Sequence, residues 1–343
     1  MKNYNELVLQ SDASIQNVIE CLNSTAKRIV LVTDRKNIFI GVVVDGDIRR
    51  GLLEGLRLTD SVMKIVNQNA TFLGASSNLS QALKLMSQRK ISHIPILDDA
   101  NRLIGLHSRE SESNQPMRDN LFVIMAGGFG TRLKPYTDQT PKPMLKVNGK
   151  PMLEHLILSA KDFGYTKFVM AVHYLAESIE SYFGDGTDLG IQIEYVRESE
   201  PLGTAGALSL LRDKPALPFI VSNADLISSV HLGAIIDFHN DQQSEATMAV
   251  QNFELQNPFG VVEVSHGDVV SIIEKPVSVS KISGGIYVLD PRMLDLLEPG
   301  KYCDMPELFR RAIDISMKVK AFMIHEDWAD IGRESDLIKI QNR

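Results

Sequence analysis

Cysteine and tryptophan are scarce in this chain of 343 residues, which contains two of the first and one of the second. Cys21 and Cys303 lie far apart and form no C-x-x-C pair. The sequence therefore offers neither a disulfide framework nor a cysteine-based zinc motif. This usage is typical of a reducing compartment, and we expect a cytoplasmic protein.

The chain also lacks long apolar runs and an excess of positive charge. No stretch of 18 or more apolar residues occurs, and the N-terminus has no apolar segment typical of a signal peptide. The formal net charge is −7 with both signs interspersed, whereas a nucleic-acid surface needs a basic stripe. We expect neither a membrane span nor a nucleic-acid partner. The length and the 44% hydrophobic content suffice for two domains with cores of their own.

The first third of the chain contains an internal repeat with an offset of 64 residues. At this offset Val18-Ile19 coincides with Ala82-Leu83, and the triplet FIG at 39–41 coincides with LIG at 103–105, without a gap. Each copy shows helical spacing of apolar residues, then a strand, a polar turn and a second strand. The length of the repeat favours a duplicated α/β module over a solenoid.

This repeat resembles a tandem pair of CBS domains and covers residues 1–112. Members of that family often bind adenine nucleotides between the copies, through a hydroxyl and an Asp near the end of the second strand. Asp47 matches the Asp in copy one, where Val44 replaces the hydroxyl; Ser108 matches the hydroxyl in copy two, where Ser111 replaces the Asp. Both half-sites are incomplete, which leaves two interpretations open: an adenine-nucleotide sensor, or a platform for a homodimer or larger assembly.

Residues 113–120 are polar, contain one proline and show no periodicity, which is the composition of a linker. From residue 121 to 343, apolar strands alternate with helical patterns, as in an α/β fold with a mostly parallel sheet. The later strands are close together and are expected to form a partly antiparallel extension. The expected strands are 121–125, 167–172, 191–196, 218–221, 245–250, 261–264, 269–273 and 286–289. The expected helices are 152–163, 175–183, 204–211, 232–240, 305–315 and 334–341.

A glycine-rich loop follows the first of these strands, in the run LFVIMAGGFGTRL. Gly127, Gly128 and Gly130 allow a sharp turn and the close approach of a ligand to backbone N–H groups. Such a loop at the carboxyl end of a strand suits a nucleoside triphosphate. Arg132, and Lys142 within Pro-Lys-Pro, add cations that can balance phosphate charge. The pattern is neither the dinucleotide-binding nor the P-loop signature.

The motif G-G-x-G-T-R-L, followed by P-K-P-M-L and G-K-P-M, resembles the signature of the sugar-phosphate nucleotidylyltransferases. These enzymes transfer a nucleoside monophosphate from an NTP to a sugar 1-phosphate and release pyrophosphate. The resemblance implies a Rossmann-like mixed sheet, similar to the GT-A glycosyltransferase fold, beside the smaller CBS-pair α/β domain. It makes Arg132 and Lys142 the catalytic cations. It assigns the nucleotide contacts to Ala126, Gly127, Gly128, Gly130, Thr131, Gly203 and Thr204.

Two carboxylates resemble the metal-binding residues of this family. Asp225 ends the strand FIVSNAD, and Asp330 lies in the run W-A-D-I-G. A triphosphate enzyme needs Mg²⁺ with oxygen ligands, so Mg²⁺ is the expected cofactor and both residues are its expected ligands. Asn223 stands where a D-x-D motif would begin. This argues against the related alternative, a metal-dependent glycosyltransferase that would release nucleoside diphosphate.

The acceptor side is implied by resemblance alone. The turn N-P-F-G, the element E-K-P and the run S-G-G-I-Y are similar to the segments that hold the sugar phosphate in this family. They contribute Gly260, Glu274, Lys275, Ser283 and Gly284. Ser283 replaces the Asn that is usual in the last run, so the identity of the sugar stays open.

The run L-G-T-A is frequent in guanylyltransferases and some uridylyltransferases, so GTP is the favoured nucleotide. The order of a CBS pair before the transferase resembles the glucosamine-1-phosphate guanylyltransferases of bacterial legionaminic acid synthesis, which supplies surface glycans such as lipopolysaccharide and glycosylated flagellin. The alternatives are a mannose- or heptose-1-phosphate guanylyltransferase, a uridylyl- or thymidylyltransferase, and a CBS-regulated binding protein without activity.

Overall fold

The computed structural model describes residues 4–25, 27–108 and 117–341, and divides the chain into two units, residues 1–114 and 115–343. The division falls within the segment 113–120, whose composition predicts a linker. Ser111 lies outside the described residues. Among the described residues, no helix combines the length and the apolar character needed to cross a lipid bilayer. Cys21 and Cys303 are both free and buried.

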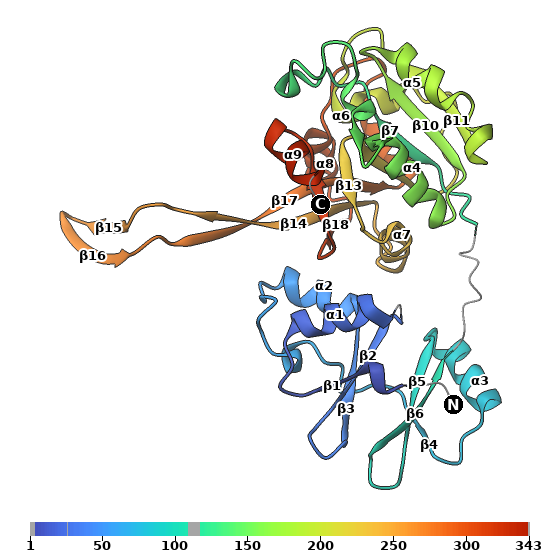
Figure 1. Cartoon of the computed structure of the whole chain (residues 1–343), viewed down its shortest axis with the longest axis vertical. Helices are drawn as coiled ribbons and strands as arrows, with labels where there is room; N and C mark the ends of the chain where they lie inside the picture. Colours follow the sequence, from blue (N-terminus) through green and yellow to red (C-terminus); the bar gives the residue numbers. More distant parts are fainter. Residues whose placement is uncertain (1–3, 26, 109–116, 342–343) are drawn as a thin grey trace. The chain divides into compact units, whose positions relative to one another are not determined.

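The N-terminal unit consists of two copies of one small α/β module (Figure 1). Six of its elements form three pairs that recur with an offset of 64 residues at both ends, which confirms the repeat. These pairs are α1 (Ile15–Thr25) and α3 (Leu79–Arg89), β2 (Ile29–Thr33) and β5 (His93–Leu97), and β3 (Phe39–Val44) and β6 (Leu103–Ser108). With β1 (Val8–Gln10) and β4 (Leu73–Gly74), the strands form two sheets, β1-β2-β3 and β4-β5-β6. Helix α2 (Asp45–Leu53) follows β3.

Two backbone hydrogen bonds join the copies, and the same offset relates them. The N–H of Phe39 donates to the carbonyl of Asn101 at 2.9 Å, and the N–H of Leu103 donates to the carbonyl of Asn37 at 3.1 Å. Both asparagines adopt left-handed backbone conformations, which Asn tolerates better than most residues. One apolar cluster buries side chains of both copies, including Leu31 and Leu103. The two copies therefore form one pseudosymmetric core.

The C-terminal unit is built on a seven-stranded mixed sheet with the order β11-β10-β7-β12-β17-β14-β18 (Figure 1). Strands β7, β10, β11 and β12 are parallel, β17 is antiparallel to β12 and β14, and β14 is parallel to β18. This arrangement confirms the expected α/β fold with an antiparallel extension. The bounds are β7 Phe122–Met125, β10 Lys167–Val172, β11 Gln192–Arg197, β12 Phe219–Asn223, β14 Ala246–Gln256, β17 Val277–Leu289 and β18 Val319–Met323.

Helices cover both faces of this sheet, because its central strands are apolar on both sides. Phe122 and Ile124 of β7 pack into one core, and Val123 between them packs into the other. The first core receives α4 (Met152–Asp162), α5 (Ala176–Phe183) and α7 (Leu232–Asp241); the second receives α6 (Gly203–Gly206) and α8 (Met305–Asp314). The expected helix at 204–211 is instead the short α6 followed by a 3-10 turn, Ala207–Leu210.

Short elements surround the carboxyl ends of the parallel strands. They are the paired strands β13 (Leu226–Ser228) and β19 (Trp328–Asp330), the paired strands β8 (Lys146–Val147) and β9 (Lys150–Pro151), the turns Thr131–Leu133 and Lys142–Met144, and α9 (Glu334–Gln341). The strand pairs are too short to show a periodic signal, and the sequence does not predict them.

Strands β14 and β17 continue beyond the sheet as a two-stranded ribbon that ends in β15 (Val261–Ser265) and β16 (Asp268–Ile273) (Figure 1). The sequence predicts strands at 245–250 and 286–289 here, and the structure extends both because 251–256 pair with 277–282 outside the sheet. We call residues 251–282 the arm.

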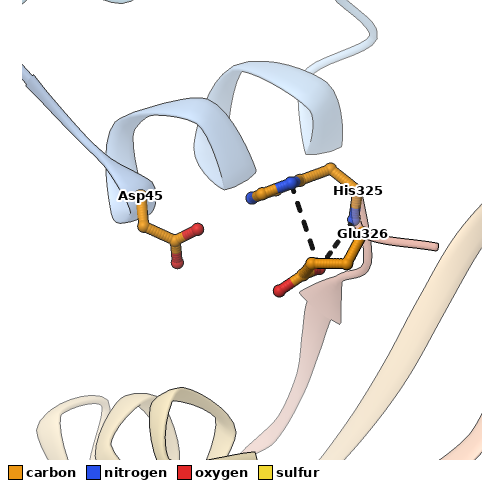
Figure 2. A group of neighbouring side chains, drawn as sticks. All are labelled: Asp45, His325 and Glu326. Atoms are coloured by element: carbon orange, nitrogen blue, oxygen red, sulfur yellow. Dashed lines mark hydrogen bonds and ion pairs between the residues drawn. The ribbon is translucent and has the colours of Figure 1, made fainter. Parts of the chain in front are cut away.

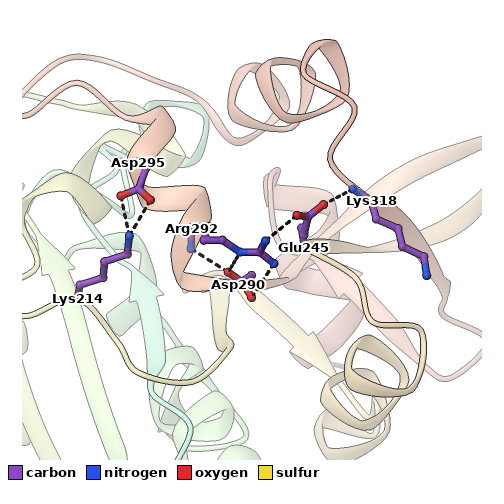
Figure 3. Close-up of polar contacts among 6 residues, drawn as sticks. All are labelled: Lys214, Glu245, Asp290, Arg292, Asp295 and Lys318. Atoms are coloured by element: carbon purple, nitrogen blue, oxygen red, sulfur yellow. Dashed lines mark hydrogen bonds and ion pairs between the residues drawn. The ribbon is translucent and has the colours of Figure 1, made fainter.

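A cluster of ion pairs lies at the end of the sheet that is away from the arm (Figure 3). Arg292 contacts Asp290 at 2.9 Å and Glu245 at 3.0 Å, and Glu245 accepts the backbone N–H of Lys318 at 2.5 Å. These residues flank the start of β14, the end of β17 and the start of β18. The contacts hold β14, β17 and β18 together at the end of the sheet that is remote from the glycine-rich loop.

Candidate functional site

The glycine-rich loop leaves β7 at the carboxyl edge of the sheet. The N–H of Ala126 donates to the carbonyl of Ala171 in β10 at 2.8 Å, so the loop begins in register with the sheet. Gly130 has a φ of 62°, and a Cβ there would lie 3.0 Å from Cβ of Lys142. Thr137 donates its hydroxyl to the carbonyl of Gly130 at 2.9 Å. The turn therefore requires glycine at 130 and brings the loop against the Lys142 segment.

Lys142, Asp225 and Asp330 converge beside this loop. Asp225 follows β12, and pairing between β13 and β19 places Asp330 next to it, with Ile331 donating its N–H to the carbonyl of Asp225 at 3.1 Å. The Nζ atom of Lys142 forms an ion pair with Asp225 and lies 3.8 Å from Asp330 Oδ1. Lys142 is buried, with 8% of its surface exposed, so its charge is poorly screened.

Arg132 lies on the same side of the site. Its guanidinium approaches Gly332, two residues after Asp330, where a Cβ would lie 3.6 Å from Nη1. Burial raises the pKa of Asp330, and the neighbouring Asp225 raises it further, whereas Lys142 and Arg132 act in the opposite direction. The structure therefore brings together both predicted cations and both predicted metal ligands.

The two carboxylates fit a divalent cation. The Oδ1 atom of Asp225 is buried and has no hydrogen-bond partner among the described residues. Burying a carboxylate oxygen without a hydrogen-bond partner costs free energy unless a ligand binds to that oxygen. The ammonium of Lys142 lies between Asp225 and Asp330, a position that attracts positive charge. Two carboxylates with phosphate oxygens completing the shell are an ordinary set for Mg²⁺.

Glu198 belongs to this site although the motifs assign it no role. It is 8% exposed, its Oε2 accepts the N–H of Leu202 at 2.8 Å, and burial raises its pKa. A Cβ on Gly127 would lie 2.4 Å from Glu198 Oε1, so the loop passes directly over this carboxylate. Its position just before the E-P-L-G-T-A run was the available signal, but burial cannot be inferred from that position.

Gly203 and Thr204 contact the chain that enters α8. A Cβ on Gly203 would lie 2.7 Å from the carbonyl oxygen of Cys303. The hydroxyl of Thr204 accepts a hydrogen bond from the N–H of Met305 at 2.8 Å. The side chain of Asp304 accepts a hydrogen bond from the N–H of Thr204 at 3.0 Å. Both residues thus have structural partners, and their contact with a nucleotide stays a prediction.

Ser283 and Gly284 lie where β17 enters the sheet. Ser283 Oγ and the hydroxyl of Tyr287 are 2.8 Å apart, and Trp328 donates its indole N–H to the carbonyl of Gly284 at 2.8 Å. A Cβ on the adjoining Gly285 would meet Asn223 Nδ2 at 2.9 Å. This part of β17 therefore borders Asn223, the last residue of β12, which lies two positions before Asp225.

Gly260, Glu274 and Lys275 lie on the arm instead. A Cβ on Gly260 would be 2.9 Å from Glu274 Oε2, so these two residues face each other across the ribbon. Figure 1 shows the arm extending away from the sheet, and the structure does not bring the three residues together with the carboxylates. Their role in binding sugar phosphate stays a prediction.

In the N-terminal unit, Asp47 and Ser108 occupy different settings. Asp47 is the third residue of α2; it accepts the N–H of Val44 at 2.9 Å and pairs with Arg50. Ser108 ends β6, opposite His93. The carboxylate of Asp47 already serves the start of the helix, and adenine-nucleotide binding at either residue stays a prediction.

His325 and Glu326 form a separate polar contact in the C-terminal unit (Figure 2). The N–H of His325 donates to the carboxylate of Glu326 at 3.1 Å, and its Nδ1 lies 4.0 Å from Oε2. Glu326 also accepts the N–H of His231, which precedes α7, at 3.4 Å. The pair thereby ties α7 to the segment after β18. Asp45, also drawn in Figure 2, belongs to the N-terminal unit.

Comparisons with known proteins agree with the sequence motifs. Residues 121–343 match the family described as nucleotidyl transferase, and residues 62–106 match the CBS domain. A probable mannose-1-phosphate guanylyltransferase 3 of Oryza sativa subsp. japonica is 39% identical over 225 residues, which cover 63% of this chain and 62% of the relative. A mannose-1-phosphate guanyltransferase of Schizosaccharomyces pombe is 34% identical over 228 residues with the same coverage. The matched part thus spans 62% of the length of these curated relatives.

Two solved structures share the fold of the C-terminal unit. A putative glucose-1-phosphate thymidylyltransferase from Bacillus anthracis has a TM-score of 0.54 at 24% identity, covering 65% of this chain and 94% of that one. HddC from Yersinia pseudotuberculosis, complexed with GMP-PN, has a TM-score of 0.50 at 27% identity, covering 65% and 98%.

Proposed function

Because the chain belongs to the nucleotidyl transferase family, we propose that it transfers GMP from GTP to a sugar 1-phosphate and releases pyrophosphate. The observation that carries this proposal is the convergence of Lys142, Asp225 and Asp330 beside the glycine-rich loop, with Arg132 on the same side. Two polyanions must meet for this reaction, and such a site lowers their repulsion.

In the proposed reaction, an oxygen of the sugar phosphate attacks the α-phosphorus of GTP in line. The bond from the α-phosphorus to the bridging oxygen breaks, and pyrophosphate leaves with that electron pair. The nucleophile is already an anion, so no general base is needed. Arg132 and the loop N–H groups would hold the leaving pyrophosphate, and Lys142 would balance charge at the α-phosphate. Alignment and charge neutralisation would supply most of the acceleration.

Mg²⁺ would be held by Asp225 and Asp330. It would neutralise phosphate charge and polarise the phosphorus–oxygen bonds. The unpartnered Oδ1 of Asp225 supports this assignment.

Glu198 supports guanine as the base. A carboxylate has only acceptor oxygens when ionised, and guanine presents a ring N–H beside its 2-amino group. Adenine lacks both donors on the corresponding edge. Glu198 lies under Gly127, where a base held against the loop would meet it. The relatives named above are guanylyltransferases, which agrees with this choice.

The sugar is the least constrained part of the proposal. Glucosamine 1-phosphate follows from the resemblance to legionaminic acid enzymes, and mannose 1-phosphate follows from the names of the relatives. Both sugar phosphates belong in the first panel of acceptors to be assayed. The legionaminic acid pathway stays a prediction.

A pyrophosphate-release assay with four NTPs and a panel of sugar 1-phosphates, with Mg²⁺ or with EDTA, tests the proposal. We expect GTP with one hexose or hexosamine phosphate to be turned over, and EDTA to abolish turnover. Asp225→Asn should lower kcat by roughly 10²–10³, whereas Asp314→Asn, an exposed residue at the end of α8, should not. Release of nucleoside diphosphate from a nucleotide sugar, without pyrophosphate release from any NTP, would contradict the proposal.

Whether the N-terminal CBS pair binds adenine nucleotides is a separate question. We propose that the pair acts first as a dimerisation platform, because the carboxylate of Asp47 is already engaged by Val44 and Arg50. Calorimetry of the full chain with AMP and ATP tests this proposal. A heat of binding that Asp47→Asn removes would contradict it and would support a nucleotide sensor.

A further inference from the structure

The segment that connects the two units ends in contacts with the C-terminal unit. Its composition predicts a linker over residues 113–120, yet its last residues are held by distant parts of the C-terminal fold. Arg118 donates its N–H to the carbonyl of Gly164 at 2.9 Å. Asn120 donates its side-chain N–H to the carbonyl of Pro218 at 2.7 Å. The chain is therefore fixed to the C-terminal unit from Arg118 onward.

The side chain of Arg118 holds helix α7. Its Nη1 and Nη2 atoms donate to the two carboxylate oxygens of Asp237 at 2.8 and 3.1 Å, a bidentate geometry that fixes direction as well as distance. The guanidinium carbon lies 6.0 Å from the centre of the ring of Tyr165, whose hydroxyl donates to the carbonyl of Leu232 at 3.1 Å. The Arg118 side chain is 14% exposed, so the ion pair is partly shielded from solvent.

The apolar face of α7 does not by itself fix the helix along its axis. Leu232, Ile235 and Ile236 pack into the core beside the sheet. Apolar contacts of this kind permit small sliding motions between packed elements. A bidentate ion pair resists such motion, because its hydrogen bonds weaken steeply when the donor and acceptor move out of line. Arg118 therefore adds a constraint that the apolar face does not supply.

The start of α7 is joined to both carboxylates of the candidate site. His231, which precedes the helix, lies six positions after Asp225 and donates its N–H to Glu326 Oε1 at 3.4 Å. Glu326 lies four positions before Asp330. The pairing of β13 with β19 joins these two segments to each other. A shift of α7 is thus transmitted to both predicted metal ligands through two short segments.

We infer that Arg118 is a positioning residue for the metal site: by holding α7, it keeps Asp225 and Asp330 at the separation that a divalent cation requires. This inference rests on the proposed function, in which these two carboxylates hold Mg²⁺. Mg²⁺ demands nearly ideal octahedral geometry at about 2.0–2.1 Å, so small shifts of its ligands lower the affinity. The same residue is where the chain from the N-terminal unit becomes fixed, so the metal site depends on how that chain is attached.

The glycine at position 233 leaves room for this contact. A Cβ on Gly233 would lie 2.9 Å from Nη2 of Arg118 and 3.0 Å from Cε1 of His231, so both side chains approach the first turn of α7 at this residue. Gly233→Ala raises the intrinsic preference for helix but must displace the guanidinium. This variant therefore separates the position of Arg118 from the stability of the helix.

Binding of Mn²⁺ to the full chain, with GTP and without sugar phosphate, tests this inference without turnover. Mn²⁺ accepts the oxygen ligands that suit Mg²⁺. The enhancement of water proton relaxation distinguishes protein-bound Mn²⁺ from Mn²⁺–GTP in solution. Arg118→Met and Asp237→Asn each remove the ion pair, and we expect each to weaken Mn²⁺ binding about threefold to tenfold, less than the roughly 10–100-fold cost of removing a group bonded directly to a metal ligand.

Two further readouts separate this role from others. The double variant should bind Mn²⁺ no more weakly than either single variant, because both changes act through one contact. In the pyrophosphate-release assay, the variants should need correspondingly more Mg²⁺ for half-maximal turnover, with kcat at saturating Mg²⁺ close to that of the wild type.

Control variants distinguish positioning from general destabilisation. Arg292→Met removes the ion pairs with Asp290 and Glu245 at the remote end of the sheet and should leave Mn²⁺ binding unchanged. Gly233→Ala should weaken binding as Arg118→Met does, without lowering the melting temperature. Arg118→Lys keeps the charge without the bidentate geometry and should recover part of the affinity. All variants are compared well below their melting temperatures.

The outcomes for this inference and for the proposed function differ. If Arg118→Met, or Gly233→Ala where the first variant does not fold, binds Mn²⁺ as the wild type does, the positioning role is wrong while the proposed function stands. An equal loss in Arg292→Met also overturns it. If Asp225→Asn binds Mn²⁺ as tightly as the wild type, the predicted metal site and the inference fail together. If no substrate pair gives pyrophosphate while the effect of Arg118→Met on Mn²⁺ persists, the proposed function fails and the positioning role stands.

Discussion

Lys142 and Asp225, which are 83 positions apart in the sequence, form a partly buried ion pair at the carboxyl edge of the sheet. Pro141 and Pro143 fix the backbone on either side of the lysine, and β12 fixes the aspartate. The pair leaves Oδ1 of Asp225 without a partner among the residues that the structure describes. A rigid cation and a carboxylate with one unused oxygen are thus held in place together.

Replacement of Lys142 by methionine should affect both catalysis and stability. The change keeps most of the buried volume and leaves Asp225 as a partly buried carboxylate without its cation, which is destabilising. We expect kcat to fall by roughly 10²–10³ and the melting temperature to fall as well. Lys167→Met is the control, because Lys167 pairs with Asp119 at 3.0 Å on an exposed part of the surface. Equal kcat for Lys142→Met and the wild type would contradict the assigned role.

Gly127 and Gly128 should respond differently to alanine. A Cβ on Gly127 would lie 2.4 Å from the buried carboxylate of Glu198, whereas a Cβ on Gly128 would meet nothing within 4 Å. Gly127→Ala must displace Glu198 or the loop, and we expect a loss of roughly 1–3 kcal/mol in the free energy of unfolding. Gly128→Ala should leave it nearly unchanged. Denaturant titration of both variants checks this, and equal losses would show that the loop does not pass over Glu198.

Thr204 offers a test of its structural contact with α8. Its hydroxyl accepts the N–H of Met305, the first residue of that helix, at 2.8 Å. Thr204→Val removes this acceptor while it preserves the shape, so we expect a loss of about 1 kcal/mol. Thr204→Ser keeps the hydroxyl and should restore most of the stability. If the valine and serine variants have the same melting temperature, the hydroxyl does not cap α8.

The sequence was sufficient to predict the convergence of residues from separate segments. Arg132, Lys142, Asp225 and Asp330 come from four separate segments of the chain, and the resemblance of their motifs to one family predicts that they act together. The carboxyl ends of parallel strands meet at one edge, so assigning the strands β7 and β12 already places the glycine-rich loop beside Asp225.

The arm and Glu198 could not be predicted in the same way. Alternating apolar residues at 251–256 and 277–282 have the same pattern as a strand inside a sheet, and the pattern does not tell which surface covers it. Glu198 is a charged residue before a Pro-containing turn, where exposure is the ordinary outcome. Its burial depends on the path of the glycine-rich loop, a contact between distant segments that local patterns do not encode.

His239 should make the stability of the C-terminal unit depend on pH. Burial lowers its pKa to about 4 from 6.5, although Asp290 acts in the opposite direction, and its Nδ1 lies 2.9 Å from Thr247 Oγ1. Above pH 6.5 the imidazole is neutral in both states. As the pH falls toward 4, the unfolded chain binds a proton that the folded chain does not, so the free energy of unfolding falls by up to about 3 kcal/mol.

His239→Asn keeps a polar atom near Thr247 and removes the titration. Urea titrations at pH 7 and pH 5 check the effect: we expect the wild type to lose about 2 kcal/mol more than the variant between these values. Equal losses in both proteins would mean that other groups cause the pH dependence.

The two hydrogen bonds between Phe39 and Asn101 and between Leu103 and Asn37 have a consequence for the origin of the N-terminal unit. Since an offset of 64 residues converts one bond into the other, each is the same contact made twice. A forerunner with a single copy of the module could have made both bonds across the axis of a symmetric pair. Gene duplication and fusion would then have turned an association that depends on concentration into a permanent one.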